Sequence, residues 1–145
     1  MANLEGFART NYVHVADLHG LQKALAPWSI GMKQAPPGTA EEGMFSFYGE
    51  SPDGAGWPTS ETDDDDNVRE LDVAKDIMPH IREGEVLVLI EASHERLLYV
   101  GGSATAWIRR GAEVERVSLQ TSDIYDMAKK RFGLSADAQI SVAEY

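Results

Sequence analysis

The chain has 145 residues, no cysteine and a formal net charge of −11, and this length suits one domain that buries roughly two-thirds of its unfolded surface without disulfides. The lack of cysteine excludes thiolate metal sites and, with no apolar leader near Met1, predicts a protein of the reducing cytoplasm. No segment reaches the ~20 apolar residues of a membrane helix, and a pI of about 4.7 argues against direct binding to nucleic acid.

The first half of the chain predicts a strand, a helix and a second strand, followed by a long loop. Residues 12–15 predict a short strand, and Asp17 is a suitable N-cap for a helix that ends at Pro27. The aromatic run 44–48 predicts a buried strand. Residues 49–67 contain Gly, Pro and Asp but almost no aliphatic side chains, so we expect an irregular acidic loop there.

A second helix is predicted after the acidic loop. Val73, Ile77 and Ile81 follow one another at four-residue spacing, which places them on one helix face. Pro79 is expected to kink this helix, because it lacks an N–H and cannot complete the helical hydrogen-bond pattern. Gly84 is a suitable C-terminal stop.

Three strands with short connections are predicted next. Residues 85–92 and 97–109 form the first two strands, with a polar turn at 93–95 between them. The pair Gly101–Gly102 is expected to bend or bulge the second strand. Residues 113–119 return as the third strand, which completes an antiparallel meander.

A last helix is expected to begin at Ser122 or Asp123 and to stop at Gly133. Residues 140–143 are expected to add an edge strand. The helix has one apolar face, which we expect to be buried. The side chains of this face are Ile124, Met127, Ala128 and Phe132.

This order of elements predicts an α+β fold, with a mainly antiparallel sheet, a C-terminal three-stranded meander and helices packed on one face. The whole chain, 1–145, is expected to form a single domain with the irregular acidic loop at about 49–67.

The segment 41–85 carries the whole net charge, because it holds 14 acidic and three basic residues while the rest of the chain is neutral. Solubility alone does not need such clustering. Three roles are open for the run of Asp63, Asp64, Asp65 and Asp66: a site for a hard cation, a solvated loop, or a surface for a cationic partner. An EF-hand needs acids at alternate positions and a glycine at the sixth, which this run lacks, so no metal site is predicted.

The histidines give no zinc signature and no cofactor site. His14, Asp17 and His19 are close in the sequence, but a strand-to-helix turn should separate their side chains. His80 and His94 have no second ligand at position i+4.

One segment could serve a small-molecule or catalytic site. Gly101 and Gly102 could let a backbone approach a ligand, with His94 and Tyr99 nearby and Ser103 as a nucleophile. The Gly-x-Ser-x-Gly elbow and the phosphate-binding glycine patterns are missing, so a β-bulge is the competing interpretation, and no catalytic residue is assigned.

Trp57 lies in a Gly-rich loop beside the acids, which is how aromatic anchors of protein interfaces are often placed. The alternative is that Trp57 folds back onto the sheet and fixes the loop. Trp28 and Trp107 lie in or beside regular elements and are expected in the core.

Four segments carry a resemblance to other proteins: 53–58, 81–86, 98–104 and 123–125. Together they make residues 11–132 resemble small uncharacterised proteins of plasmids, integrative elements and phages. The resemblance implies no activity and no catalytic residues. It implies a context, in which small acidic proteins bind host proteins such as defence or DNA-handling factors. The long aspartate run departs from this pattern.

The leading hypothesis is a non-enzymatic interaction protein whose acidic segment binds a basic protein surface, one that could normally hold nucleic acid. The alternative is a small-molecule-binding or enzymatic domain with its pocket near Gly101–Gly102. A third possibility is self-association through a sheet edge at 113–119 or 140–143. The oligomeric state is left open.

Overall fold

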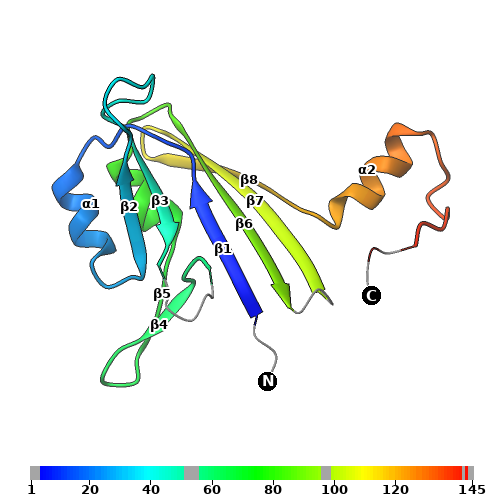
Figure 1. Cartoon of the computed structure of the whole chain (residues 1–145), viewed down its shortest axis with the longest axis horizontal. Coiled ribbons are helices and arrows are strands. Elements are labelled where there is room, and N and C mark those ends of the chain that lie inside the picture. Colours follow the sequence, from blue (N-terminus) through cyan, green and yellow to red (C-terminus); the bar gives the residue numbers. More distant parts are fainter. Residues whose placement is uncertain (1–3, 51–55, 96–98, 142, 144–145) are drawn as a thin grey trace.

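The computed structural model describes residues 4–50, 56–95, 99–141 and 143. Its main feature is a six-stranded sheet in the order β2-β3-β1-β6-β7-β8, in which every neighbouring pair is antiparallel (Figure 1). The α+β class and the C-terminal meander are therefore confirmed. The strands are β1 Leu4–Thr10, β2 Ile30–Gln34, β3 Phe45–Gly49, β6 Val86–Glu95, β7 Tyr99–Arg110 and β8 Glu113–Gln120.

Strands β1 and β2 were not predicted. Strand β1 turns Ala8 and Thr10 into the core, and these small side chains give no apolar alternation that a sequence pattern could reveal. The strand predicted at 12–15 is wrong: that segment makes only two isolated bridges, Val13 to Phe45 and Val15 to Ile81.

Helix α1, Leu18–Leu25, begins as predicted. The Asp17 carboxylate accepts a hydrogen bond from the Gly20 N–H at 3.0 Å, which satisfies one of the free donors of the first turn. Leu21 and Leu25 are buried against the sheet. The helix ends at Leu25, two residues before Pro27, in agreement with the expected stop at this proline.

The predicted second helix is two short turns. A π-helical turn, η1 Val73–Ile77, is followed by a 3-10 turn, η2 Met78–His80. The change of geometry occurs next to Pro79, which has no N–H to donate to the preceding turn. The apolar spacing still has its expected effect, because Val73, Ile77 and Ile81 are all buried.

Part of the predicted irregular loop is a β-hairpin. Strand β4, Ser60–Thr62, pairs with β5, Val68–Glu70, and the hairpin extends away from the sheet (Figure 1). Pairing continues at its base, where Leu71 N donates to Thr59 O at 2.9 Å. The prediction that 49–67 lacks regular structure is therefore wrong for 60–62.

One face of the sheet carries the core, which α1, η1, η2 and the segment before β4 cover. Trp28 and Trp107 are each 7 % exposed and belong to this core, as predicted. The core residues are Ala8, Val13, Leu21, Leu25, Trp28, Ile30, Phe47, Trp57, Val73, Ile77, Met78, Ile81, Leu87, Leu89 and Trp107.

The connection between β6 and β7 differs from the prediction. Residues 93–95 continue β6 instead of forming a turn. Gly101 and Gly102 pair one-to-one with Ser93 and Ala92, so the expected bulge is absent from this described stretch. A bulge needs two residues opposite one, which this register excludes.

Helix α2, Asp123–Arg131, and its stop at Gly133 are confirmed, but its expected burial is wrong. None of its residues is buried, and the helix lies beyond the end of β8, away from the sheet (Figure 1). The predicted edge strand is also wrong for residues 140, 141 and 143, which are outside any strand.

Gly49 fixes the approach of the loop that carries Trp57. A Cβ at Gly49 would lie 2.3 Å from the backbone oxygen of Gly56, and backbone cannot rotate aside as a side chain can. We expect Gly49→Ala to lower the free energy of unfolding by about 1–3 kcal/mol, measured by urea denaturation. It should also shift tryptophan emission to the red. An unchanged midpoint and spectrum would show that this contact has room to relax.

Candidate functional site

The acidic run forms the turn of the β4–β5 hairpin, and Asp63 holds that turn together. Its carboxylate accepts hydrogen bonds from Asp65 N at 3.0 Å and from Asn67 N and Nδ2 at 2.9 and 3.3 Å. Its backbone N–H donates to Asn67 O at 3.0 Å. Asp66 has a φ of 60°, a left-handed conformation that aspartate tolerates better than most residues. The run is therefore an ordered turn.

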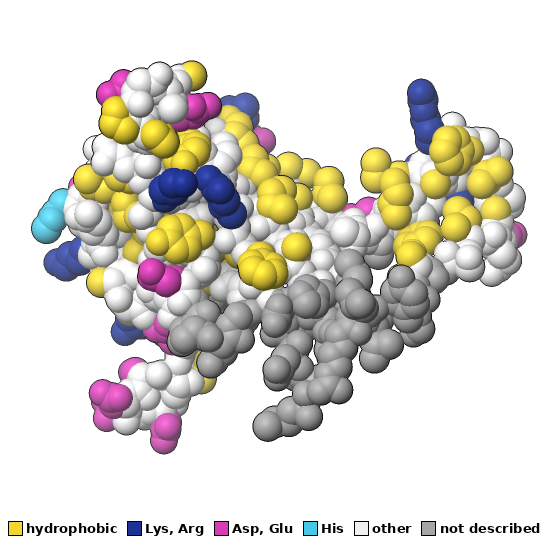
Figure 2. All heavy atoms as spheres, in the orientation of Figure 1, with side chains coloured by type: hydrophobic (Ala, Val, Ile, Leu, Met, Phe, Trp, Pro, Cys, Tyr) yellow, Lys and Arg dark blue, Asp and Glu magenta, His cyan; other side chains and the backbone are white. Residues whose placement is uncertain are grey.

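The remaining three carboxylates of the run point to solvent. Asp64, Asp65 and Asp66 are exposed at the tip of the hairpin, and Figure 2 shows acidic side chains on this projection. Residues 60–70 hold six carboxylates and one guanidinium, Arg69, which gives a net charge of −5. The tip is a compact negative surface on a narrow support.

The pKa of Asp63 is lowered, first of all by the hydrogen bond from the Asn67 backbone. A lowered pKa means that the folded turn favours the charged carboxylate, so this stabilisation is present at neutral pH and is lost as the pH falls through the lowered pKa. We expect the Asn67 amide resonance to move toward its disordered position in acid. Asp63→Asn should remove this pH dependence, and an amide that titrates equally in the variant would contradict it.

Two other carboxylates of the acidic segment are bonded to parts of the fold outside the hairpin. Glu85 contacts His14, with Oε1 2.5 Å from Nδ1, and accepts a bond from the His14 backbone at 2.7 Å. Glu83 accepts a hydrogen bond from Gly111 N. These two carboxylates are bonded to other parts of the fold, whereas Asp64, Asp65 and Asp66 are exposed together at the hairpin tip.

The side chains of His14, Asp17 and His19, which are close in the sequence, have different partners in the structure. Asp17 caps α1 and lies 3.5 Å from Nδ1 of His80, while His14 is bound to Glu85 and His19 is exposed. The Gly20 N–H is the main cause of the lowered pKa of Asp17. Among the residues that the structure describes, no group of three or more acidic or histidine side chains is placed to hold a metal ion.

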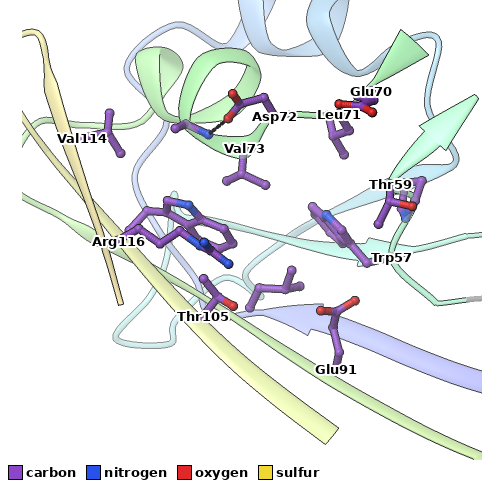
Figure 3. A pocket seen from close by; sticks show the side chains of 14 residues that line it. Trp57, Thr59, Glu70, Leu71, Asp72, Val73, Glu91, Thr105, Val114 and Arg116 are labelled. Carbon is purple, nitrogen blue, oxygen red and sulfur yellow. Dashed lines mark hydrogen bonds between the residues drawn. The ribbon is translucent and has the colours of Figure 1, made fainter. Parts of the chain in front are cut away.

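A cavity of about 430 Å³ opens at the base of the hairpin, between the sheet and the segment that carries η1 (Figure 3). Trp57 and Thr59 form one wall of the cavity. Glu70, Asp72 and Val73 lie on the side that faces the sheet. The volume is in the range of small-ligand pockets. The sheet residues of the wall are Leu89, Glu91, Thr105, Trp107, Val114 and Arg116.

Charge is unevenly distributed around this cavity. Glu91 is half-buried near Trp57, and within the described residues its carboxylate has one hydrogen bond, from Ser103 Oγ at 3.2 Å (Figure 3). Asp72 caps η1 by accepting from Ala74 N at 3.0 Å. Arg116 lies at the other side, opposite Trp107 in the β7–β8 pairing. An indole beside a carboxylate suits a cationic group, because both attract positive charge.

Trp57 is 8 % exposed and belongs to the core. This is the arrangement in which the indole folds back and fixes its loop on the sheet. It leaves little indole surface for a partner outside the cavity. Trp57 precedes β4 at the base of the hairpin, and the aspartates follow β4 at its tip.

The alternative pocket is placed only in part. The side chains of His94 and Tyr99 lie outside the described residues, although the backbone of both is in β6 and β7. Gly101 and Gly102 are half-buried in the ladder next to Glu91 and Ser103. The cavity begins at the next pair of this ladder, Glu91 with Ser103, because Glu91 is one of its lining residues.

Sequence reasoning did not find the cavity. One signal was present, because Glu91 occupies an inward position after Leu87 and Leu89, where an apolar residue is expected. Its other walls come from segments up to about sixty residues apart, which no local pattern brings together.

Comparisons with protein families, with curated proteins and with solved structures give no match. In the described part of the chain, no helix has both the length and the apolar character to cross a membrane.

Proposed function

We propose that this chain is a non-enzymatic interaction domain that binds a basic surface of a partner protein through the tip of the β4–β5 hairpin. The observation that carries the proposal is the ordered turn at Asp63, which presents three exposed carboxylates on a projection. A preformed charged tip loses little conformational freedom on binding, and its charge accelerates association by long-range attraction.

The cavity extends this surface and would accept one cationic side chain of the partner. Glu91 and the indole of Trp57 lie at the hairpin side of the cavity, so a lysine or arginine that passes the tip could enter there (Figure 3). Arg116 lies on the far side of the cavity. It would favour an acidic residue beside the cationic residue in the partner's sequence.

The resemblance to proteins of mobile elements supports a partner in the host cytoplasm. A defence or DNA-handling factor with a basic nucleic-acid site is a suitable class, because spaced carboxylates attract the same cationic groups as phosphates do.

Calorimetric titration of the protein with an octapeptide of alternating lysine and alanine tests the proposal. We expect measurable binding at low salt that weakens as salt is raised, and no binding of a matched glutamate peptide. Absence of lysine-peptide binding at low salt, or binding that does not change with salt, would contradict the proposal.

A second candidate function is binding of a small molecule, which the mixed charge of the cavity favours. A carboxylate at one side and a guanidinium at the other suit a zwitterion with an apolar body between the indoles. Ligand-observed NMR with a panel of free amino acids tests it. Glu91→Gln and Arg116→Gln should each abolish the signal, and a signal that survives both would exclude this site.

A further inference from the structure

Exposed apolar side chains gather at two places on this chain. Among the side chains that the structure describes, twelve large hydrophobic ones are exposed, and all but Leu18 and Val68 belong to one of these places. Monomeric proteins rarely leave such groups uncovered. The first group is Phe7, Val86, Ile90, Val117 and Leu119 on the sheet; the second is Ile124, Met127, Phe132, Leu134 and Ile140 on α2 and the tail after it.

The first group lies on the outer face of the sheet, which is the face opposite the core. Along β7, Thr105 and Trp107 point into the core, so Ala104 and Ala106 between them point outward. Ala104 pairs with Ile90 on β6 and with Leu119 on β8, and Ala106 stands opposite Val117. Small residues along the middle strand have larger ones on both sides, and a hollow of about 280 Å³ opens where Val86, Ala106 and Val117 line this face. We call the outward face of β7 from Gly102 to Ile108 the outer trough.

Helix α2 has the size and pattern to fill the outer trough. Ile124, Met127 and Phe132 recur at helical spacing and are 57, 56 and 72 % exposed, and Figure 2 shows hydrophobic side chains gathered over this helix. Its nine residues span about 13.5 Å, and the trough from Gly102 to Ile108 is roughly 20 Å long.

The helix is held away from the trough of its own chain. Thr121 N donates to Gly102 O at 3.0 Å, and Gln120 N donates to the Asp123 carboxylate at 2.6 Å, so the sheet ladder continues up to the start of α2. These bonds direct α2 beyond the end of β8 (Figure 1). To reach its own outer face the chain would have to break them and reverse.

We propose that this protein forms a two-fold dimer in which α2 of each copy lies in the outer trough of the other. When each copy places its α2 in the outer trough of the other, both groups of exposed side chains become covered, and the two contacts are identical as in an isologous dimer. Covering ten half-exposed large side chains would bury on the order of 1,000 Å² per chain, against about 800 Å² per partner in a stable interface.

The charge at one end of the trough favours one direction of the helix. Arg9 stands beside Ile90 near that end, whereas at the other end Glu115 forms an ion pair with Arg110, with 3.1 Å between Oε1 and Nη1. Helix α2 carries Asp123 and Asp126 in its first turn and three basic residues in its last. A helix that runs from Gly102 toward Ile108 brings its acidic start to Arg9, and its basic end lies beside the neutral Glu115–Arg110 pair.

Sedimentation velocity and cysteine pairing test the dimer, and the absence of native cysteine makes the pairing unambiguous. We expect a dimer for the wild type, and a disulfide between an Ala104→Cys chain and a separately tagged Met127→Cys chain. Met127→Asp should raise the dimer dissociation constant by roughly 100-fold or more, with unchanged circular dichroism because Met127 is exposed in the single chain.

Val68→Asp is the matched control, since Val68 is equally apolar and 68 % exposed but lies on the hairpin. It should leave the dimer intact. A wild type that stays monomeric at high concentration would overturn the proposal. So would a disulfide that forms only within one chain when both cysteines are present, or a dimer that Met127→Asp does not weaken.

Discussion

Trp57→Ala is expected to lower the free energy of unfolding by about 3–5 kcal/mol, which is a large part of the stability of an ordinary domain. The indole is 8 % exposed and contributes to the same core as Leu89 and Trp107, so its removal leaves a cavity that the neighbours cannot fill. Urea denaturation followed by circular dichroism measures the loss. Tryptophan fluorescence is unsuitable, because the substitution removes one of the three emitters.

The same substitution should weaken partner binding beyond its effect on stability. Trp57 anchors the segment that enters β4, so without it the base of the hairpin is less restrained and the tip loses part of its preformed geometry. Trp57→Phe should retain more stability and more binding than alanine does. Val68→Ala, an exposed change on the hairpin, should cost less than about 0.5 kcal/mol. Equal losses for Trp57→Ala and Val68→Ala would contradict the core role.

Replacing Asp64, Asp65 and Asp66 together by asparagine is expected to reduce the affinity for a basic partner about 10-fold. Each exposed charge contact contributes roughly 0.5 kcal/mol, so three contribute about 1.5 kcal/mol, which corresponds to a factor of ten. The dependence of affinity on salt should become shallower at the same time. Calorimetry with the lysine octapeptide at two salt concentrations measures both effects.

Asp63 is kept in this variant because its carboxylate holds the turn, so that loss of charge is separated from loss of structure. Asparagine at position 66 accepts the positive φ found there. The matched control is Glu41→Gln with Glu42→Gln, which removes exposed carboxylates from a different loop. If the control weakens binding as much as the tip variant does, net charge and not the hairpin is responsible.

Local signals predicted the elements that carry their own start and stop residues. Helix α1 has a capping aspartate and a proline after its end, and the meander has dense runs of β-branched residues. Strand β1 has neither kind of signal, because its inward residues are small. It was therefore missed, although it occupies the middle of the sheet.

Patterns describe the character of a face but not what covers it. The spacing of Ile124, Met127 and Phe132 predicts α2 correctly, yet no residue of that helix is buried against the sheet of its own chain. The segment of the acidic run likewise predicts an irregular loop, because it has almost no aliphatic side chains. The bonds that order it depend on Asp63 and Asn67 lying opposite each other in a hairpin.

The candidate site could be predicted only in part for the same reason. The exposed aspartates are evident from the sequence, whereas the cavity behind them needs Glu91, Trp107 and Arg116 to meet Trp57 across the fold. Pairing of three strands sets those positions, and pairing partners are distant in the sequence.

Affinity capture from a cell lysate tests the central claim most directly. The wild type, the Asp64–Asp66→Asn variant and the Glu41/Glu42 control are used as baits, washed at low and high salt, and the recovered proteins are identified by mass spectrometry. The hairpin account predicts a basic protein that the wild type and the control recover at low salt, and that is lost from the tip variant and at high salt. Recovery of the same proteins by all three baits, or of none by any, would contradict it.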